Sequence, residues 1–167
     1  SIFKMKPRIS IIIPTLNEEK YIGKNLKQFL PFKKKYDLEL IVSDGKSKDN
    51  TVKIARKYAD KVIVYNKKGK QGISGGRNAG AKTAKGDILI FFDADIRIGN
   101  LKEFFETLIE VFKNKRVVAA TTPTYIYPEE ENFSYRFFHF MFNSVEYSFN
   151  KLGIGRGRGE CQITRTS

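Results

Sequence analysis

The chain has 167 residues, of which 41% are hydrophobic and 13% aromatic, and its formal net charge at pH 7 is +13. This length and composition argue for one packed domain, and against a disordered chain, a second full domain or a membrane-spanning helix. The positive charge predicts attraction to polyanions such as nucleic acid, an anionic membrane face or phosphorylated small molecules, although a lysine-rich surface would serve solubility equally well.

Seven segments carry the hydrophobic pattern of a strand or a helix. In chain order they are a strand at 8–15, a helix at 19–30, a strand at 38–45, a helix at 47–59, a strand at 61–66, a helix at 75–86 and a strand at 87–95. Strands that alternate with helices are joined by right-handed crossovers and form a mostly parallel sheet. The pattern therefore predicts an α/β fold in which helices flank such a sheet.

Polar and charged side chains follow the predicted strands. In sheets of this kind, ligands bind beyond the carboxyl ends of the strands. The residues expected to converge on that rim are Asn17, Glu18, Asp44, Lys70, Arg77, Asp93 and Asp95. A purely structural sheet would need few of them, so the rim is the predicted ligand site.

Asp93 and Asp95 follow an apolar run that should be buried, and a single residue separates them. On an extended chain both side chains would point the same way, and two like charges repel unless a cation or water separates them. A divalent ion that bridges Asp95, and Asp93 through water, to two phosphate oxygens would relieve this repulsion. The pattern predicts a nucleotide-diphosphate site with Mg²⁺ or Mn²⁺, whereas two aspartates in a solvated turn are the simpler alternative.

Other residues on the predicted rim suit the rest of a nucleotide. Arg77 and Lys70 are expected to make charge-assisted contacts with phosphate, and Gly76 lets the backbone approach it closely. Asp44 is expected to accept hydrogen bonds from the base or the ribose. Two better-known phosphate motifs are excluded: Leu40 stands where the P-loop needs its first glycine, and GISGGRNAG lacks the first Gly-x-Gly of the dinucleotide fingerprint.

Three segments, ISIIIPTLNEEKYIGKNL, ELIVSDGKSKDNT and GGRNAGAKTAKGDILIFFDAD, together resemble the family 2 glycosyltransferases, including the dolichol-phosphate mannose synthase type. The resemblance runs from about residue 8 to residue 122. It implies the GT-A fold, with a Rossmann-like, mostly parallel sheet, and a transferase that takes a sugar from a nucleotide-diphosphate donor. It also implies a divalent metal, Mn²⁺ or Mg²⁺, and normally inversion at the anomeric carbon.

The resemblance also implies roles for individual positions of this chain. They are Pro14, Thr15, Asn17 and Glu18 beside the base and ribose, Asp44 and Gly45 at the nucleoside, Arg77 near the diphosphate, and Asp93 and Asp95 at the metal, with Asp95 favoured as the direct ligand. Two positions depart from the family. Leu16 stands where many relatives carry an aromatic residue, and Ser43 replaces the first of two acidic residues.

The end of the chain is expected to lack part of the catalytic machinery. In the family, the carboxylate that activates the acceptor follows the region that GRGECQITRTS resembles, and only Glu146 and Glu160 are late candidates here. We therefore expect residues 1–122 to form the nucleotide-sugar-binding core. Residues 123–167 are expected to begin an acceptor-side region that is truncated, with the catalytic base unassigned.

Residues 125–154 are rich in Phe and Tyr. A core-facing helix is the favoured interpretation, and a segment at the membrane surface near a lipid-linked acceptor is the alternative. The expected acceptor is lipid-linked or a glycan, and the expected location is the cytoplasm, with peripheral contact at the cytoplasmic face of a membrane. Two rival functions stay open, a non-enzymatic RNA-binding module and a nucleotidyltransferase of similar fold, although no nucleic-acid motif is present and no nucleic-acid partner is expected.

Overall fold

The computed structural model describes residues 7–65, 73–122 and 161–166. Within these residues, six strands form one sheet in the order β3-β2-β1-β4-β6-β5. The strands are β1 (Ile9–Thr15), β2 (Leu38–Asp44), β3 (Lys61–Val64), β4 (Ile88–Phe92), β5 (Ala119–Thr121) and β6 (Cys161–Arg165). The helices are α1 (Ile22–Phe29), the 3-10 turn η1 (Leu30–Phe32), α2 (Lys33–Tyr36), α3 (Thr51–Ala55), α4 (Ile73–Ala81) and α5 (Leu101–Lys113).

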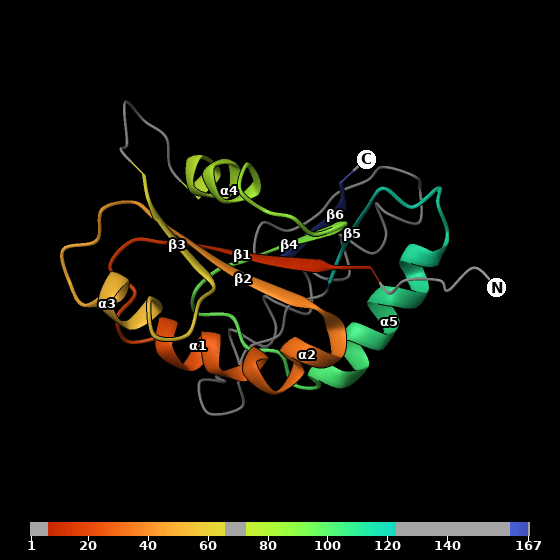
Figure 1. Cartoon of the computed structure of the whole chain (residues 1–167), viewed down its shortest axis with the longest axis horizontal. Helices are drawn as coiled ribbons and strands as arrows, with labels where there is room; N and C mark the ends of the chain where they lie inside the picture. The colour runs from red at the N-terminus through yellow and green to blue at the C-terminus, as the bar shows by residue number, and fades with distance from the viewer. Residues whose placement is uncertain (1–6, 66–72, 123–160, 167) are drawn as a thin grey trace, which may run out of the picture.

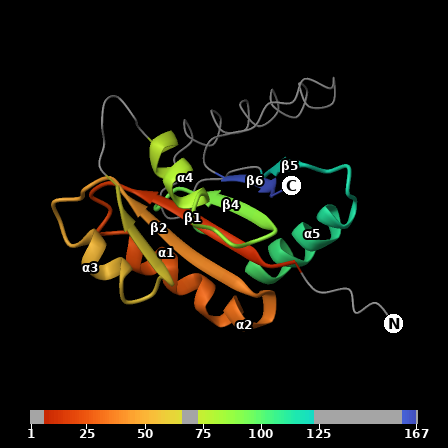
Figure 2. The ribbon, with the colours of Figure 1, turned by 45° about the horizontal axis from the view of Figure 1, so that its top comes forward.

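The sheet has a helical layer on each face. Helices α1, α2 and α5 cover one face and α4 lies on the other, as Figures 1 and 2 show. Strands β1 to β4 pair in parallel, and β6 pairs antiparallel with both β4 and β5. The predicted α/β fold with a mostly parallel sheet is thus confirmed. None of the helices in the described part of the chain combines the length and the apolar composition needed to cross a bilayer.

Several elements differ from the sequence prediction. Helix α5 and strands β5 and β6 were not predicted, and three predicted elements end early: α3 at Ala55, α4 at Ala81 and β4 at Phe92. Strand β6 lies between β4 and β5 in the sheet, although its residues come from the segment that we assigned to an acceptor-side region. The division at residue 122 stays a prediction.

The core follows from the alternation of side chains along β1. Ile9, Ile11 and Ile13 face the layer of α1, α2 and α5, where they join the larger cluster of buried apolar residues. Ile12 faces the opposite way and forms a smaller cluster with Ile41. All five side chains are fully buried, so β1 contributes to the packed core on both faces of the sheet.

Helix α4 packs unusually close to the sheet at Gly80. A Cβ atom added there would lie 2.4 Å from Cγ2 of Ile12. Any larger side chain would therefore push α4 away from β1. This close approach fixes the height of α4 above the sheet, and with it the position of Arg77 one turn earlier in the helix.

The carboxylate of Glu39 is buried near the amino end of β2. Glu39 accepts hydrogen bonds from Ser10 Oγ at 2.7 Å and from the backbone N–H of Lys85 at 2.9 Å, and Lys61 Nζ lies 3.7 Å from its other oxygen. Burial alone would raise the pKa of Glu39, but these hydrogen bonds and the positive charge outweigh it and lower the pKa. The network ties β1, β2 and the turn before β4 together.

Gly80→Ala should destabilise the fold, because the added methyl group has no room beside Ile12. We expect the free energy of unfolding to fall by about 1–3 kcal/mol, measured by urea denaturation. Gly99→Ala is the matched control, since a Cβ at Gly99 meets nothing within 4 Å. Equal stability of the Gly80 variant and the wild type would contradict the close packing of α4.

Glu39→Gln should reduce stability at neutral pH by about 1–3 kcal/mol, because it removes a charged hydrogen-bond acceptor. Since the pKa of Glu39 is lowered in the folded state, its ionised form stabilises the fold above the unfolded-state pKa. That contribution is lost as the pH falls through the folded-state value, so the gap between variant and wild type should narrow on acidification. Denaturation at several pH values measures it, with the exposed Glu110→Gln as control; a gap that widens would contradict the assignment.

Candidate functional site

The loops after β1 and β2 are joined by reciprocal hydrogen bonds. The backbone N–H of Asn17 donates to Ser47 Oγ, the N–H of Lys48 donates to Asn17 Oδ1, and the N–H of Glu18 donates to Thr51 Oγ1, each at 2.8 Å. Asn17 has φ 59°, a left-handed conformation that asparagine tolerates better than most residues. These bonds hold the loop after β1 against the loop after β2, and the two loops together form one polar rim.

Asp44 is fully buried at the end of β2. Its carboxylate accepts hydrogen bonds from Thr15 Oγ1 at 2.9 Å, from Ser47 Oγ at 2.5 Å and from the Ser47 backbone N–H at 2.8 Å. The N–H of Gly45 donates to the Thr15 carbonyl at 2.9 Å. Asp44 therefore shapes the loop that follows β2, and its expected contact with a nucleoside stays a prediction.

The chain turns immediately after β4. The strand ends at Phe92, and the N–H of Ile96 donates to the Asp93 carbonyl at 3.2 Å, which closes a turn around Asp95. Our expectation that Asp93 and Asp95 continue the extended strand is wrong, because β4 ends at Phe92, although both carboxylates lie close enough to Glu18 to raise its pKa. Asp93 is partly buried, whereas Asp95 is exposed.

Asp93 forms an ion pair with Arg77 of α4. Arg77 Nη2 lies 2.9 Å from Asp93 Oδ1, and the two side chains are 15% and 27% exposed. Arg77 Nη1 also donates to Gln162 Oε1 at 3.4 Å. The Arg77 guanidinium therefore neutralises the charge of Asp93, one of the two aspartates. Gln162 was not predicted as part of the site.

Helix α1 holds the turn that carries the two aspartates. Asn25 Nδ2 donates to the Ile96 carbonyl at 2.7 Å and to the Asp93 carbonyl at 3.4 Å. Gln28, one turn later, donates to the Ile96 carbonyl at 3.3 Å and accepts from the N–H of Ile98 at 3.1 Å. Neither residue was predicted; the available signal was an asparagine on the otherwise apolar stripe of the helix.

Negative charge gathers on this rim. The pKa of Glu18 is raised, first by burial of its carboxyl group and then by the charges of Asp95, Asp49 and Asp93. Glu18 follows β1, whereas Asp93 and Asp95 follow β4, so strand ends far apart in sequence meet here. The rim is thus suited to a ligand that brings positive charge.

A metal ion fits this rim only together with a ligand. Within the described residues, no group of three or more His, Cys, Asp or Glu side chains is gathered closely enough to hold an ion. Mg²⁺ and similar ions are commonly bound by one or two carboxylates and completed by the phosphates of a substrate. The exposed Asp95, with the Glu18 carboxylate nearby, suits such a shared site.

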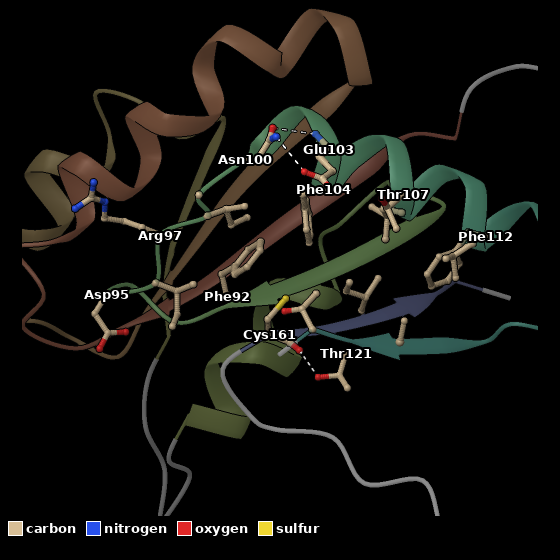
Figure 3. Close-up of a pocket in the computed structure, with 18 residues that line it drawn as sticks. Phe92, Asp95, Arg97, Asn100, Glu103, Phe104, Thr107, Phe112, Thr121 and Cys161 are labelled. Carbon is tan, nitrogen blue, oxygen red and sulfur yellow. Dashed lines mark hydrogen bonds between the residues drawn. The ribbon is translucent and has the colours of Figure 1, made fainter. Parts of the chain in front are cut away.

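A cavity of about 670 Å³ lies between α5 and strands β4, β5 and β6. Phe92, Phe104 and Phe112 form much of its apolar lining, and Asp95 and Arg97 lie at the end away from Phe112 (Figure 3). Its volume is within the range of small-molecule sites. The cavity therefore joins an apolar surface to the rim of strand ends.

The structure thus brings together the predicted residues that it describes at the rim. Strand ends and the loops after them carry Pro14, Thr15, Asn17, Glu18, Asp44, Gly45, Asp93 and Asp95, and helix α4 carries Gly76 and Arg77. Lys70, Glu146 and Glu160 lie outside the described residues. The roles expected for all of them stay predictions.

The sequence matches the profile described as "Glycosyl transferase family 2" over residues 10–166. It is 37% identical over 112 residues to a 4,4'-diaponeurosporenoate glycosyltransferase of Staphylococcus haemolyticus, an alignment that covers 65% of this chain and 29% of that protein. The chain therefore spans less than a third of the length of this relative.

Two solved structures resemble the fold. S. aureus TarS in complex with UDP-GlcNAc is 26% identical with a TM-score of 0.59, over 75% of this chain and 36% of that one. The mannosyltransferase PcManGT from Pyrobaculum calidifontis, in complex with GDP-Man and Mn²⁺, has a TM-score of 0.69 at 20% identity, over 97% of this chain and 45% of that one. The second likeness concerns the fold alone.

Asp95→Asn should lower the pKa of Glu18 toward its usual range, because it removes the largest of the neighbouring charges that raise it. Carboxyl-carbon NMR titration of Glu18 measures this change directly. Glu110→Gln, an exposed change on α5, should leave the pKa of Glu18 as it is. An unchanged pKa in the Asp95 variant would mean that the two carboxylates do not share one rim.

Proposed function

Because the chain belongs to glycosyl transferase family 2, we propose that it forms the donor-binding part of an enzyme that transfers a sugar from a nucleotide-diphosphate donor to an acceptor. The observation that carries the proposal is the charge arrangement at the carboxyl edge of the sheet. A partly buried Arg77–Asp93 pair stands beside the exposed Asp95, with Glu18 close to both aspartates. A diphosphate and a divalent cation together match this mixture of charges.

The two aspartates would have different tasks. Asp93 orients the Arg77 guanidinium, which is held on α4 and supplies positive charge for the diphosphate. Asp95, with Glu18 nearby, would ligate Mn²⁺ or Mg²⁺ together with the phosphate oxygens. When bound, that ion would stabilise the negative charge that develops on the leaving nucleoside diphosphate.

The nucleoside would lie over the loops after β1 and β2. Pro14, Thr15 and Gly45 lie at the start of these loops, and the bonds that Asp44 accepts from Thr15 and Ser47 tie the end of β1 to the loop after β2. A rigid loop pair costs less ordering on binding than a flexible one. We expect these loops to recognise the base and the ribose.

The acceptor would approach from the side of Asp95. We propose a lipid-linked or glycan acceptor, and the apolar cavity that ends at Asp95 supports an acceptor with an apolar part. Peripheral contact with the cytoplasmic face of a membrane would bring such an acceptor within reach, and the basic charge of the chain favours that contact. Inversion would need a carboxylate base near the acceptor hydroxyl, and no described residue is assigned to that task.

A nucleotidyltransferase of similar fold would use the same metal and nucleotide. The two reactions differ in their products: glycosyl transfer releases a nucleoside diphosphate, whereas nucleotidyl transfer releases inorganic diphosphate. Family membership favours the first. RNA binding would need no metal, and would weaken steeply with added salt.

Asp95→Ala should abolish the part of donor binding that depends on metal. Isothermal titration with UDP and with GDP, each in Mn²⁺ and in EDTA, should show that the wild type gains affinity for one nucleotide in Mn²⁺ and that the variant does not. Glu106→Ala, an exposed change on α5, is the control and should behave as the wild type.

The same affinity of the Asp95 variant and the wild type in Mn²⁺ would contradict the metal assignment. Binding of RNA by the wild type, without binding of either diphosphate, would contradict the donor site as a whole.

A further inference from the structure

Tyr65 is the first residue after β3 and was not predicted as part of the site. Its backbone N–H donates to the Asp44 carbonyl at 3.0 Å. Because β3 runs parallel to β2, the end of β3 lies on the same edge of the sheet as the loop that follows Asp44. The side chain of Tyr65 is partly exposed, so it lies at the surface of this edge.

The hydroxyl of Tyr65 reaches over two glycines. A Cβ added at Gly45 would lie 3.3 Å from Tyr65 Oη, and a Cβ added at Gly76 would lie 3.2 Å from the same atom. A side chain at either position would therefore crowd the phenol. Gly45 begins the loop after β2 and Gly76 lies in α4, so the Tyr65 hydroxyl stands between two elements of the rim.

Two apolar side chains lie near the same two glycines. Leu16 Cδ1 would lie 3.7 Å from a Cβ added at Gly45, and Pro14 Cβ would lie 3.0 Å from one added at Gly76. The Leu16 side chain is 47% exposed, so it is open to a ligand. A nucleobase has a flat apolar face and a polar edge, and this grouping offers a surface for each.

The Tyr65 hydroxyl has unused hydrogen-bonding capacity. It makes no hydrogen bond to any other residue that the structure describes. A phenolic hydroxyl can both donate and accept, and can therefore pair with the polar edge of either a pyrimidine or a purine. The same contact could not be made by Leu16 or Pro14.

We propose that Tyr65 contacts the base of the nucleotide donor through its hydroxyl, and so sets the affinity for the nucleoside. This assignment rests on the proposed donor function of the rim. The end of β3 would then contribute a contact to the base, in addition to the roles in donor binding proposed for the ends of β1, β2 and β4. The assignment also explains why glycines suit positions 45 and 76, since both leave room for the phenol.

The test is Tyr65→Phe, which keeps the ring and removes only the hydroxyl. In isothermal titration with Mn²⁺, the variant should bind whichever of UDP and GDP the wild type prefers about tenfold more weakly. Its affinity for inorganic pyrophosphate should be unchanged, because that ligand lacks a nucleoside. Tyr58→Phe is the matched control: Tyr58 lies in the turn after α3 with Lys27 of α1 over its ring, so this change should alter neither affinity.

The possible results separate the two proposals. Unchanged nucleotide affinity in Tyr65→Phe, or an equal loss of nucleotide and pyrophosphate affinity, would overturn the role of Tyr65 and leave the donor site standing. A wild type that binds neither nucleotide would overturn the donor site and the role of Tyr65 with it. Equal melting temperatures of variant and wild type will show that a loss of affinity does not come from unfolding.

Discussion

The ion pair between Arg77 and Asp93 is the interaction on which the arrangement of the rim depends. It joins α4 to the first residue after β4, across the carboxyl edge of the sheet. Other contacts fix the position of both partners. Helix α4 packs closely on β1 at Gly80, and the side-chain amide of Asn25 donates to the Asp93 carbonyl. A partly buried charge pair of this kind is costly to break, because the remaining charge would be left with too little solvation.

This ion pair makes two neighbouring aspartates chemically unequal. Asp93 faces a guanidinium, whereas Asp95 lies exposed in the turn, and of the two Asp95 raises the pKa of Glu18 more. Two similar groups with different surroundings commonly take different roles in an active site. Here the difference favours Asp93 as the residue that positions Arg77, and Asp95 as the residue open to a cation.

Much of the fold could be predicted from the sequence, because the four parallel strands are apolar runs separated by turn residues and helical segments. Strands β5 and β6 could not, since β5 has only three residues and their pairing joins segments about 40 residues apart. The ends of the predicted strands indicated which polar residues would lie close together, and their role as a donor site stays a prediction. The turn after Phe92, the contacts of Asn25 and the position of Tyr65 depend on tertiary packing, which periodicity does not report.

The most direct test of this account is a titration of the chain with Mn²⁺, followed by electron paramagnetic resonance of the free ion, with and without a nucleoside diphosphate. The account predicts weak binding of Mn²⁺ alone, because one exposed aspartate and a nearby glutamate make an incomplete site, and much tighter binding once the diphosphate supplies further oxygens. Tight binding of Mn²⁺ by the chain alone, or binding that the nucleotide does not change, would contradict it.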